Sequence, residues 1–165
     1  MDAARLFEEH HHALCRYLWR FTGDADVAAD AAQEAFVRLL EQPPRAGSER
    51  AWLFRVATNL ARETGRTRRR RWLLLLHAAG RAPHADPPPP PDAALASGER
   101  RGRVQQALRA LSAKERMALL MREEGFSQRE IAEAVGTTTK SVGTLIARAL
   151  DKLAPRLGLD REDPG

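Results

Sequence analysis

Apolar side chains recur at three- and four-residue steps along much of the chain, which is the pattern of helices that bury one face. The first run extends from Leu6 to Phe21, and Gly23 ends it. A second run follows Asp24, a residue type that caps helix N-termini, and stops at the prolines at positions 43 and 44. This pattern predicts two helices.

A third helix is expected after the candidate N-cap Ser48. Trp52, Val56 and Leu60 stand four residues apart, and we expect them to form its buried stripe. The helix should continue into the arginine-rich run at positions 66–71. The three helices together predict one small core within residues 1–76.

The helical pattern stops between residues 77 and 98, where Pro83 and five consecutive prolines at positions 87–91 occur. Proline lacks the amide donor and clashes with the preceding turn, so this segment predicts a semi-rigid, extended linker. Fully extended, about 22 residues span on the order of 70 Å, so the flanking blocks need not touch. We therefore expect two domains, 1–76 and 99–165.

The second block has the spacing of a helix-turn-helix. Two capping-box patterns, Ser112 with Glu115 and Ser127 with Glu130, each mark a helix start. A short helix at 127–135, a turn at 136–138 and a long helix at 139–153 are predicted. The residues expected on the inner faces are Val104, Ala107, Leu108 and Leu111, then Ile131 and Val135, then Val142, Ile146 and Ala149.

Composition favours an all-α fold, because only 5% of the 165 residues are aromatic and strand-favouring residues are sparse. The net charge of +5 is unevenly distributed along the chain. Residues 1–44 hold 4 basic and 8 acidic side chains, whereas residues 45–72 hold 9 and 2. An acidic helical region beside a strongly basic one predicts two partners, one of them polyanionic.

Other residue types narrow the function further. Cys15 is the only cysteine, so no disulfide can form within the chain, and we expect the protein to reside in the reducing cytoplasm. We expect Cys15 itself to be a small residue of the core. His10–His12 would fan out around a helix and cannot converge on one metal. The longest apolar stretch, Trp72–Leu76, is far shorter than the roughly 20 residues that cross a bilayer. Its leucines, Leu73–Leu76, either dock a partner, extend the first core or collapse on the linker. No motif predicts an enzyme such as a nuclease, a cofactor or a metal site.

The order of these pieces resembles the extracytoplasmic-function type of the σ70 family, the small sigma subunits of bacterial RNA polymerase. The resemblance covers nearly the whole chain. It implies a non-catalytic subunit that binds core polymerase, directs it to promoters and helps to open the DNA. The matching strings are Gly23-Asp24-Ala25-Asp26, the set Asp30, Gln33, Glu34, Phe36 and Arg38, the runs 51–61 and 66–71, and in the second block the runs 107–111 and 126–133 with Arg148-Ala149.

The same resemblance assigns roles to individual residues of the first block. The second helix would grip the clamp of core polymerase, with Phe36 as an apolar anchor. The alternative is that Phe36 is ordinary core and the acidic residues are a solvated face. The third helix would bind the −10 element through side chains that follow phosphates or hold exposed bases. The implied polymerase-binding set is Asp30, Gln33, Glu34, Phe36 and Arg38, and the implied −10 set is Arg55, Asn59, Arg62, Arg66, Arg68 and Arg69.

In the second block, the long helix would enter the major groove at the −35 element. Its implied DNA-binding residues are Lys140, Ser141, Thr144 and Arg148. Gly143 and Ala147 stand where relatives usually carry basic or larger residues. Direct −35 readout is therefore expected to be weaker, or shifted toward Lys140 and Arg148.

A helix-turn-helix repressor or activator with an N-terminal dimerisation or sensing domain explains residues 104–157 equally well. It leaves the basic helix of the first block unexplained, and it predicts a symmetric dimer on a palindromic site. The sigma-factor hypothesis instead predicts a free monomer whose partners are core RNA polymerase and promoter DNA. An anti-sigma factor that wedges between the domains is a further hypothesis, which a proline-rich linker would permit.

Overall fold

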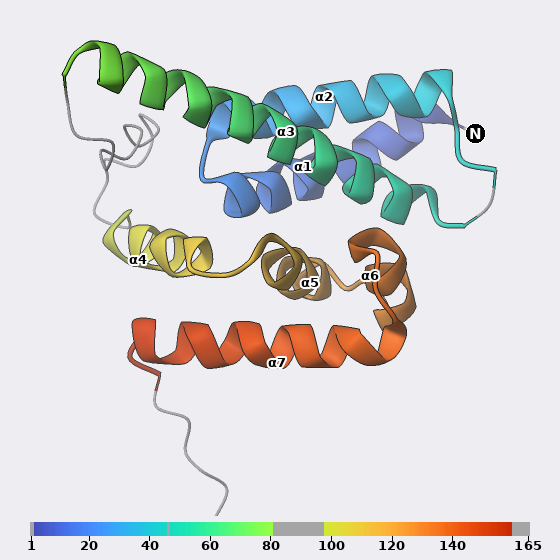
Figure 1. Cartoon of the computed structure of the whole chain (residues 1–165). Helices are drawn as coiled ribbons and strands as arrows, with labels where there is room; N and C mark the ends of the chain where they lie inside the picture. The colour runs from blue at the N-terminus through green and yellow to red at the C-terminus, as the bar shows by residue number, and fades with distance from the viewer. Residues whose placement is uncertain (1, 46, 81–97, 160–165) are drawn as a thin grey trace, which may run out of the picture.

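The computed structural model describes residues 2–45, 47–80 and 98–159, and every regular element in these ranges is an α-helix. The helices form two stacked groups, α1–α3 above and α4–α7 below, with α7 farthest from the first group (Figure 1). The all-α prediction is confirmed. The helix bounds are α1 Ala3–Thr22, α2 Ala25–Glu41, α3 Glu49–Ala78, α4 Gly98–Arg109, α5 Ala113–Glu123, α6 Gln128–Val135 and α7 Thr139–Arg156.

The predicted helix ends are confirmed where a cap marks them. Gly23 ends α1 with a left-handed φ of 70°, a conformation that suits glycine. The carboxylate of Asp24 accepts hydrogen bonds from the amides of Asp26 and Val27 at 2.9 and 3.1 Å. Both capping boxes of the second block are formed, because in each the serine hydroxyl and the glutamate carboxylate bond the other residue's amide.

Two predictions about the third helix need correction. It runs on to Ala78, and Gly98 already belongs to α4, so both ends of the expected linker are helical. The rest of that linker, 81–97, lies outside the described residues. Trp52, Val56 and Leu60 are only partly buried, because α3 packs against α1 and α2 on one side and α6 on another. The fully buried stripe of α3 lies beside them, at Leu53, Phe54, Ala57, Thr58 and Ala61.

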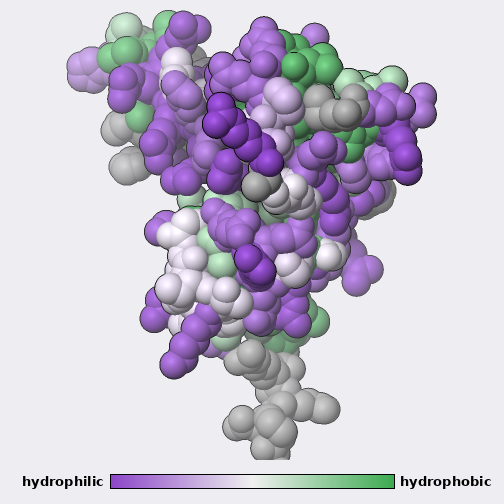
Figure 2. Space-filling view, turned by 90° about the vertical axis from the view of Figure 1, so that its right-hand side faces the viewer, coloured by the Kyte–Doolittle hydropathy of each residue, from purple (hydrophilic) through white to green (hydrophobic). Residues whose placement is uncertain are grey.

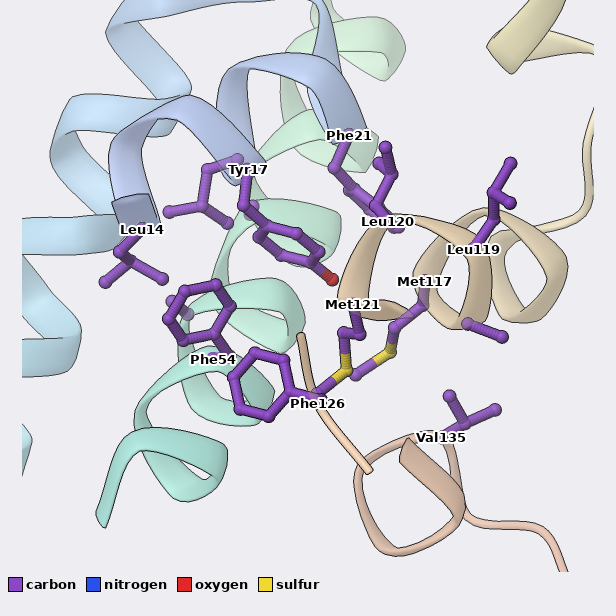
Figure 3. Close-up of a cluster of buried hydrophobic side chains, with 14 of the residues drawn as sticks. Leu14, Tyr17, Phe21, Phe54, Met117, Leu119, Leu120, Met121, Phe126 and Val135 are labelled. Atoms are coloured by element: carbon purple, nitrogen blue, oxygen red, sulfur yellow. The ribbon is translucent and has the colours of Figure 1, made fainter. Parts of the chain in front are cut away.

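The two groups of helices pack directly on each other. The rings of Phe54 in α3 and Phe126 after α5 meet edge to face with centroids 4.8 Å apart. Met121 lies beside them and Tyr17 of α1 completes the cluster (Figure 3). The hydroxyl of buried Tyr17 lies 2.9 Å from that of Thr58. The sequence did not predict whether the two blocks touch, and in this structure one continuous apolar core joins them.

Arginine side chains reinforce this interface by binding helix C-termini of the opposite group. Arg50 in α3 donates to the carbonyl of Glu124, the C-cap of α5, and lies 4.0 Å from the centroid of Phe126. Arg116 in α5 donates to the carbonyl of Phe21 in the last turn of α1 at 3.0 Å. The guanidinium of Arg16 pairs with the carboxylate of Glu124 at 2.9 Å. Positive charge is favourable at these helix ends, so the packing is specific as well as apolar.

Within the lower group, Glu115 fastens α5 to α7. Its buried carboxylate accepts hydrogen bonds from the ammonium of Lys152 at 2.8 and 3.0 Å and from the amide of Ser112 at 3.0 Å. Burial raises the pKa of Glu115, but the hydrogen bonds from Lys152 and Ser112 outweigh this effect, so the pKa lies below its ordinary 4.5.

One prediction about the inner faces of this group is wrong. Val104 was expected to point inward, but it is 39% exposed.

Replacing this carboxylate gives a stability prediction. We expect Glu115→Gln to lower the free energy of unfolding at neutral pH by about 1–3 kcal/mol, because Lys152 loses a charged partner. Because the pKa of Glu115 is lower in the folded than in the unfolded state, its ionised carboxylate stabilises the fold at pH values above its ordinary pKa. This stabilisation is lost as the pH falls through the folded-state pKa. The free energy of unfolding, measured by chemical denaturation at about pH 7 and about pH 3, should therefore fall less between these pH values in the variant than in the wild type. The exposed control Glu123→Gln should behave as wild type, and equal losses in all three proteins would contradict the prediction.

Candidate polymerase and nucleic-acid interfaces

The outward face of α2 carries most of the predicted polymerase-binding residues. Asp30, Gln33, Glu34 and Arg38 are all exposed, at helical spacings that place them on one side. Glu34 and Arg38 form an ion pair of 3.1 Å across one turn. The face is therefore mixed in charge, with acidic side chains at its N-terminal end.

Phe36 does not lie on this face. It is 7% exposed, and its ring packs against that of Phe7, with centroids 5.0 Å apart, because α1 covers this side of α2. The expected apolar anchor is therefore a core residue in this structure. Val37 and Leu40, which are 41% and 58% exposed, are the large apolar side chains that α2 offers to a partner. Val37 follows Gln33 by four residues, so helical periodicity alone could have identified it.

The group formed by α1–α3 exposes apolar side chains on its surface. Most of the surface in the space-filling view is hydrophilic, and hydrophobic patches show in the upper half, the half that contains α1–α3 (Figure 2). Phe7, which is exposed beside buried Phe36, adds to the apolar area of α1 and α2. This end of the first group combines apolar and charged side chains, the composition of a protein-binding surface.

The predicted −10 residues divide among three places on α3. Asn59, Arg62 and Arg66 line an open hollow of about 420 Å³ together with Glu63, which was not among the predicted residues. Their spacing puts all four on one stripe of the helix. No residue of the described part of α4–α7 lines this hollow, so it is open in this arrangement.

Arg55 lies instead in a cleft between the two groups of helices. The cleft is lined by Trp52 and Arg55 of α3 and by Glu130 and Glu133 of α6, and it holds about 70 Å³. Acidic side chains of the second group thus stand opposite one end of the basic helix. Arg55 is therefore separated from the other predicted −10 residues by its place beside α6.

Arg68 and Arg69 are exposed on the last third of α3. The guanidinium of Arg68 pairs with the carboxylate of Asp24, the N-cap of α2, at 2.9 Å. A phosphate at Arg68 would therefore compete with an existing ion pair. Leu76 farther along is buried but does not belong to the common apolar core, and Leu74 and Leu75 are each more than 60% exposed. Docking of a partner by this apolar segment stays a prediction.

The outward face of α7 holds the predicted −35 residues. Lys140, Thr144 and Arg148 are exposed, while Val142, Ile146 and Ala149 point inward as predicted. Ser141 is half-buried, and its hydroxyl lies 2.8 Å from that of the N-cap Thr138, so part of its hydrogen-bonding capacity is used locally.

The small residues of α7 are also on this face. Gly143 and Ala147 are both exposed. A side chain added at Gly143 would meet nothing within 4 Å, so the fold itself does not require glycine there. The centre of this face is consequently flat, and its charged groups stand toward either end at Lys140 and Arg148.

Cys15 and the adjacent histidines have structural contacts. The sulfur of Cys15 lies 3.5 Å from a ring nitrogen of His11, and burial raises the pKa of the thiol. His11 stacks on Phe7 with ring centroids 4.2 Å apart. Among the described residues, no three His, Cys, Asp or Glu side chains are grouped as metal ligands, and no helix is long and apolar enough to cross a membrane.

Comparisons with known proteins agree with this division into two groups of helices. Residues 6–72 match the family Sigma-70 region 2, and residues 101–153 match Sigma-70, region 4. The ECF RNA polymerase sigma factor SigL of Mycobacterium tuberculosis is 34% identical, over 94% of this chain and 90% of SigL.

Two solved structures have a similar fold. One is the sigma factor RpoE in its co-crystal structure with the anti-sigma factor NepR from Bartonella quintana, with a TM-score of 0.71 and 22% identity over 97% of this chain and 99% of that one. The other is CnrH in complex with the cytosolic domain of CnrY, with a TM-score of 0.69 and 25% identity over 96% and 88%. These similarities span both groups of helices, which a helix-turn-helix repressor hypothesis does not explain. The chain belongs to the extracytoplasmic-function (ECF) family of RNA polymerase sigma factors, which are transcription regulators and not enzymes.

Proposed function

We propose that this chain acts as a cytoplasmic, monomeric promoter-specificity subunit that uses three separate helical faces. The α2 face binds core RNA polymerase, the α3 stripe holds the opened −10 element, and the outward face of α7 binds the −35 element. The observation that carries the proposal is that exposed basic side chains lie on two different helices, α3 of the first group and α7 of the second. Asn59, Arg62 and Arg66 line a hollow on α3, whereas Lys140 and Arg148 are exposed on α7, the helix that lies farthest from α1–α3 (Figure 1).

Simultaneous binding of both elements requires the two groups of helices to separate. Promoter elements two duplex turns apart lie on the order of 70 Å from each other, at about 34–36 Å per turn. In the packed arrangement α6 stands directly against α3, and Arg55 lies in the cleft between them. We therefore assign this arrangement to the free protein, and an open arrangement to the polymerase complex.

An anti-sigma factor that favours the packed arrangement is part of the proposal. RpoE was crystallised with the anti-sigma factor NepR, and its chain superposes on this one over nearly its whole length. A partner that bound only the packed form would withhold the protein from polymerase by population shift alone.

Neutralising α7 tests the DNA-binding part of the proposal. In holoenzyme reconstituted with core polymerase, Lys140→Ala and Arg148→Ala should each weaken promoter binding and lower the salt dependence of log K by about one unit. Filter binding or fluorescence anisotropy over a salt series measures both quantities. Lys114→Ala, an exposed charge on α5, is the matched control and should change neither.

The function itself is tested by run-off transcription. The wild-type chain should bind core polymerase and support initiation at promoters selected from a genomic or random DNA library. Failure to bind core polymerase, or to support initiation at any sequence, would overturn the proposal. Tight, salt-insensitive binding of the free chain to duplex DNA would also contradict it, since several phosphates should be neutralised together.

A further inference from the structure

The C-terminal end of α3 carries side chains that none of the three proposed interfaces uses. The helix continues to Ala78, and its end projects beyond α1 and α2 (Figure 1). The match to Sigma-70 region 2 stops at residue 72, and the match to region 4 begins at residue 101. The last residues of α3 lie outside both matches, so their exposed side chains need a separate explanation.

Helical spacing places two arginines and two leucines on one side of this end. Leu74 and Leu75 follow Arg71 by three and four residues, and Leu74 also follows Arg70 by four, so these side chains are neighbours. Both arginines are exposed, and the two leucines are 63% and 65% exposed. Ala78, seven residues after Arg71, is exposed on the same side. The terminal face of α3 thus consists of Arg70, Arg71, Leu74, Leu75 and Ala78.

The terminal face is positively charged and has no acidic neighbour along the helix. No aspartate or glutamate occurs in the sequence between Glu63 and Asp86. Within the part of the chain that the structure describes, Arg70 and Arg71 take part in none of the ion pairs. Two cationic groups therefore stand beside two exposed leucines, a combination that favours a partner with both anionic and apolar groups.

An anionic lipid bilayer has this combination of groups. Arginines on such a helix bind lipid phosphates, while leucines reach the boundary between headgroups and acyl chains. DNA would occupy the arginines but leave both leucines in water. A partner helix or peptide would dock in a groove, and neither of the hollows lined by α3 includes Leu74 or Leu75. Charge and shape together favour a flat, anionic lipid surface.

We propose that the terminal face of α3 binds the surface of membranes that contain anionic lipids. The arginines lie at the level of the lipid phosphates, and the leucines enter only as far as the headgroup boundary. Such an attachment is peripheral and reversible, because it inserts little apolar surface. The proposal does not rest on the proposed function, since the terminal face lies outside the polymerase-binding and DNA-binding sets.

Co-sedimentation of the full chain with lipid vesicles tests the proposal. The chain should pellet with vesicles of phosphatidylglycerol mixed with phosphatidylcholine, and not with vesicles of phosphatidylcholine alone. Leu74→Ser and Leu75→Ser should each weaken binding to the anionic vesicles about tenfold. Leu159→Ser changes a leucine that is also 63% exposed, and it should bind as the wild type. Circular dichroism should show unchanged helicity, because all three leucines are exposed.

A second pair of variants separates the terminal face from net charge. Arg70→Gln/Arg71→Gln should weaken binding to anionic vesicles by about 25-fold, at about fivefold for each arginine. Lys114→Gln/Arg122→Gln removes the same charge from exposed positions of α5 and should change binding little. Equal losses in the two double variants would show that the vesicles attract only the overall positive charge, and they would overturn the proposal.

A fluorescent probe distinguishes insertion of the leucines from adsorption to the surface. An environment-sensitive dye is attached to Ala78→Cys in a Cys15→Ala background. Its emission should shift to shorter wavelength when anionic vesicles are added, because the terminal face enters the headgroup boundary. The same dye on Ala147→Cys of α7 should show no shift, and an equal shift at both positions would contradict the assignment to α3.

Two further results would overturn the proposal and leave the proposed function standing. One is the absence of binding of the wild-type chain to anionic vesicles. The other is equal vesicle binding by the wild type, Leu74→Ser and Leu75→Ser. If the wild type binds no vesicles and these two variants bind core polymerase more weakly, the terminal face belongs to a protein partner instead.

Discussion

Cross-linking the two groups of helices is expected to reduce promoter-dependent initiation to the background of core polymerase alone. Arg16 of α1 and Glu124 at the end of α5 face each other across the interface, and their side chains form an ion pair of 2.9 Å. Cysteines at these two positions, in a Cys15→Ala background, can be joined by a short bismaleimide with a reducible centre. The packed arrangement would then be permanent.

The size of the effect follows from geometry. When one tethered module cannot reach its site, the gain from linking two modules, about 100-fold or more, is lost entirely. Run-off transcription before and after reduction of the linker measures the effect, and reduction should restore initiation. Each single-cysteine chain treated with the same reagent is a control and should remain active. Full activity of the cross-linked chain would refute the opening step.

Placing a charge on the apolar part of α2 is expected to weaken binding to core polymerase by roughly 30-fold or more. Val37 and Leu40 are the exposed large apolar residues of this helix, beside Gln33, Glu34 and Arg38. Val37→Asp or Leu40→Asp would bury an unpaired carboxylate in the complex, and such changes at an interface centre cost about 2 kcal/mol or more, a loss of roughly 30-fold in affinity.

Size-exclusion chromatography or surface plasmon resonance with core polymerase measures this loss. The matched control is Val104→Asp on α4, where a valine of nearly equal exposure lies outside α2. Circular dichroism should show that all three chains remain folded, since the changed side chains are exposed. Wild-type affinity in Val37→Asp and Leu40→Asp would show that the polymerase binds elsewhere.

The helices and their ends could be predicted because the signals are local. Asp24, Ser48, Ser112 and Ser127 each cap a helix through a hydrogen bond to an amide two or three residues along the chain. The outward positions of α7 follow equally from helical periodicity, since α7 buries only one face. Neither inference needs knowledge of the rest of the fold.

The burial of α3 and Phe36 could not be predicted in the same way. A single apolar stripe is a fair expectation for a helix with one neighbour, but α3 is covered on two sides, so its fully buried residues lie beside the predicted stripe. Phe36 is in the core because Phe7, 29 residues earlier, packs against it. Both outcomes depend on which helices meet in space.

The interface between the two groups was invisible in the sequence for a different reason. Arg50 and Arg116 bind backbone carbonyls of the opposite group, and backbone atoms leave no trace in the pattern of residue types. In the sequence these arginines look the same as the phosphate-binding arginines expected nearby. Charge counting therefore located the basic helix but could not separate the arginines that hold the interface from those that we propose bind DNA.

Tethered DNA cleavage in the holoenzyme–promoter complex tests the central division of labour most directly. An iron-chelate cleavage reagent is attached in turn to Thr67→Cys on α3 and Ala147→Cys on α7, both exposed positions, with Cys15 replaced by alanine. The α3 probe should cut at the −10 element, and the α7 probe should cut about two duplex turns upstream, roughly 20 base pairs away. Cuts from both probes at one place, or from neither probe in a complex that initiates transcription, would contradict the account.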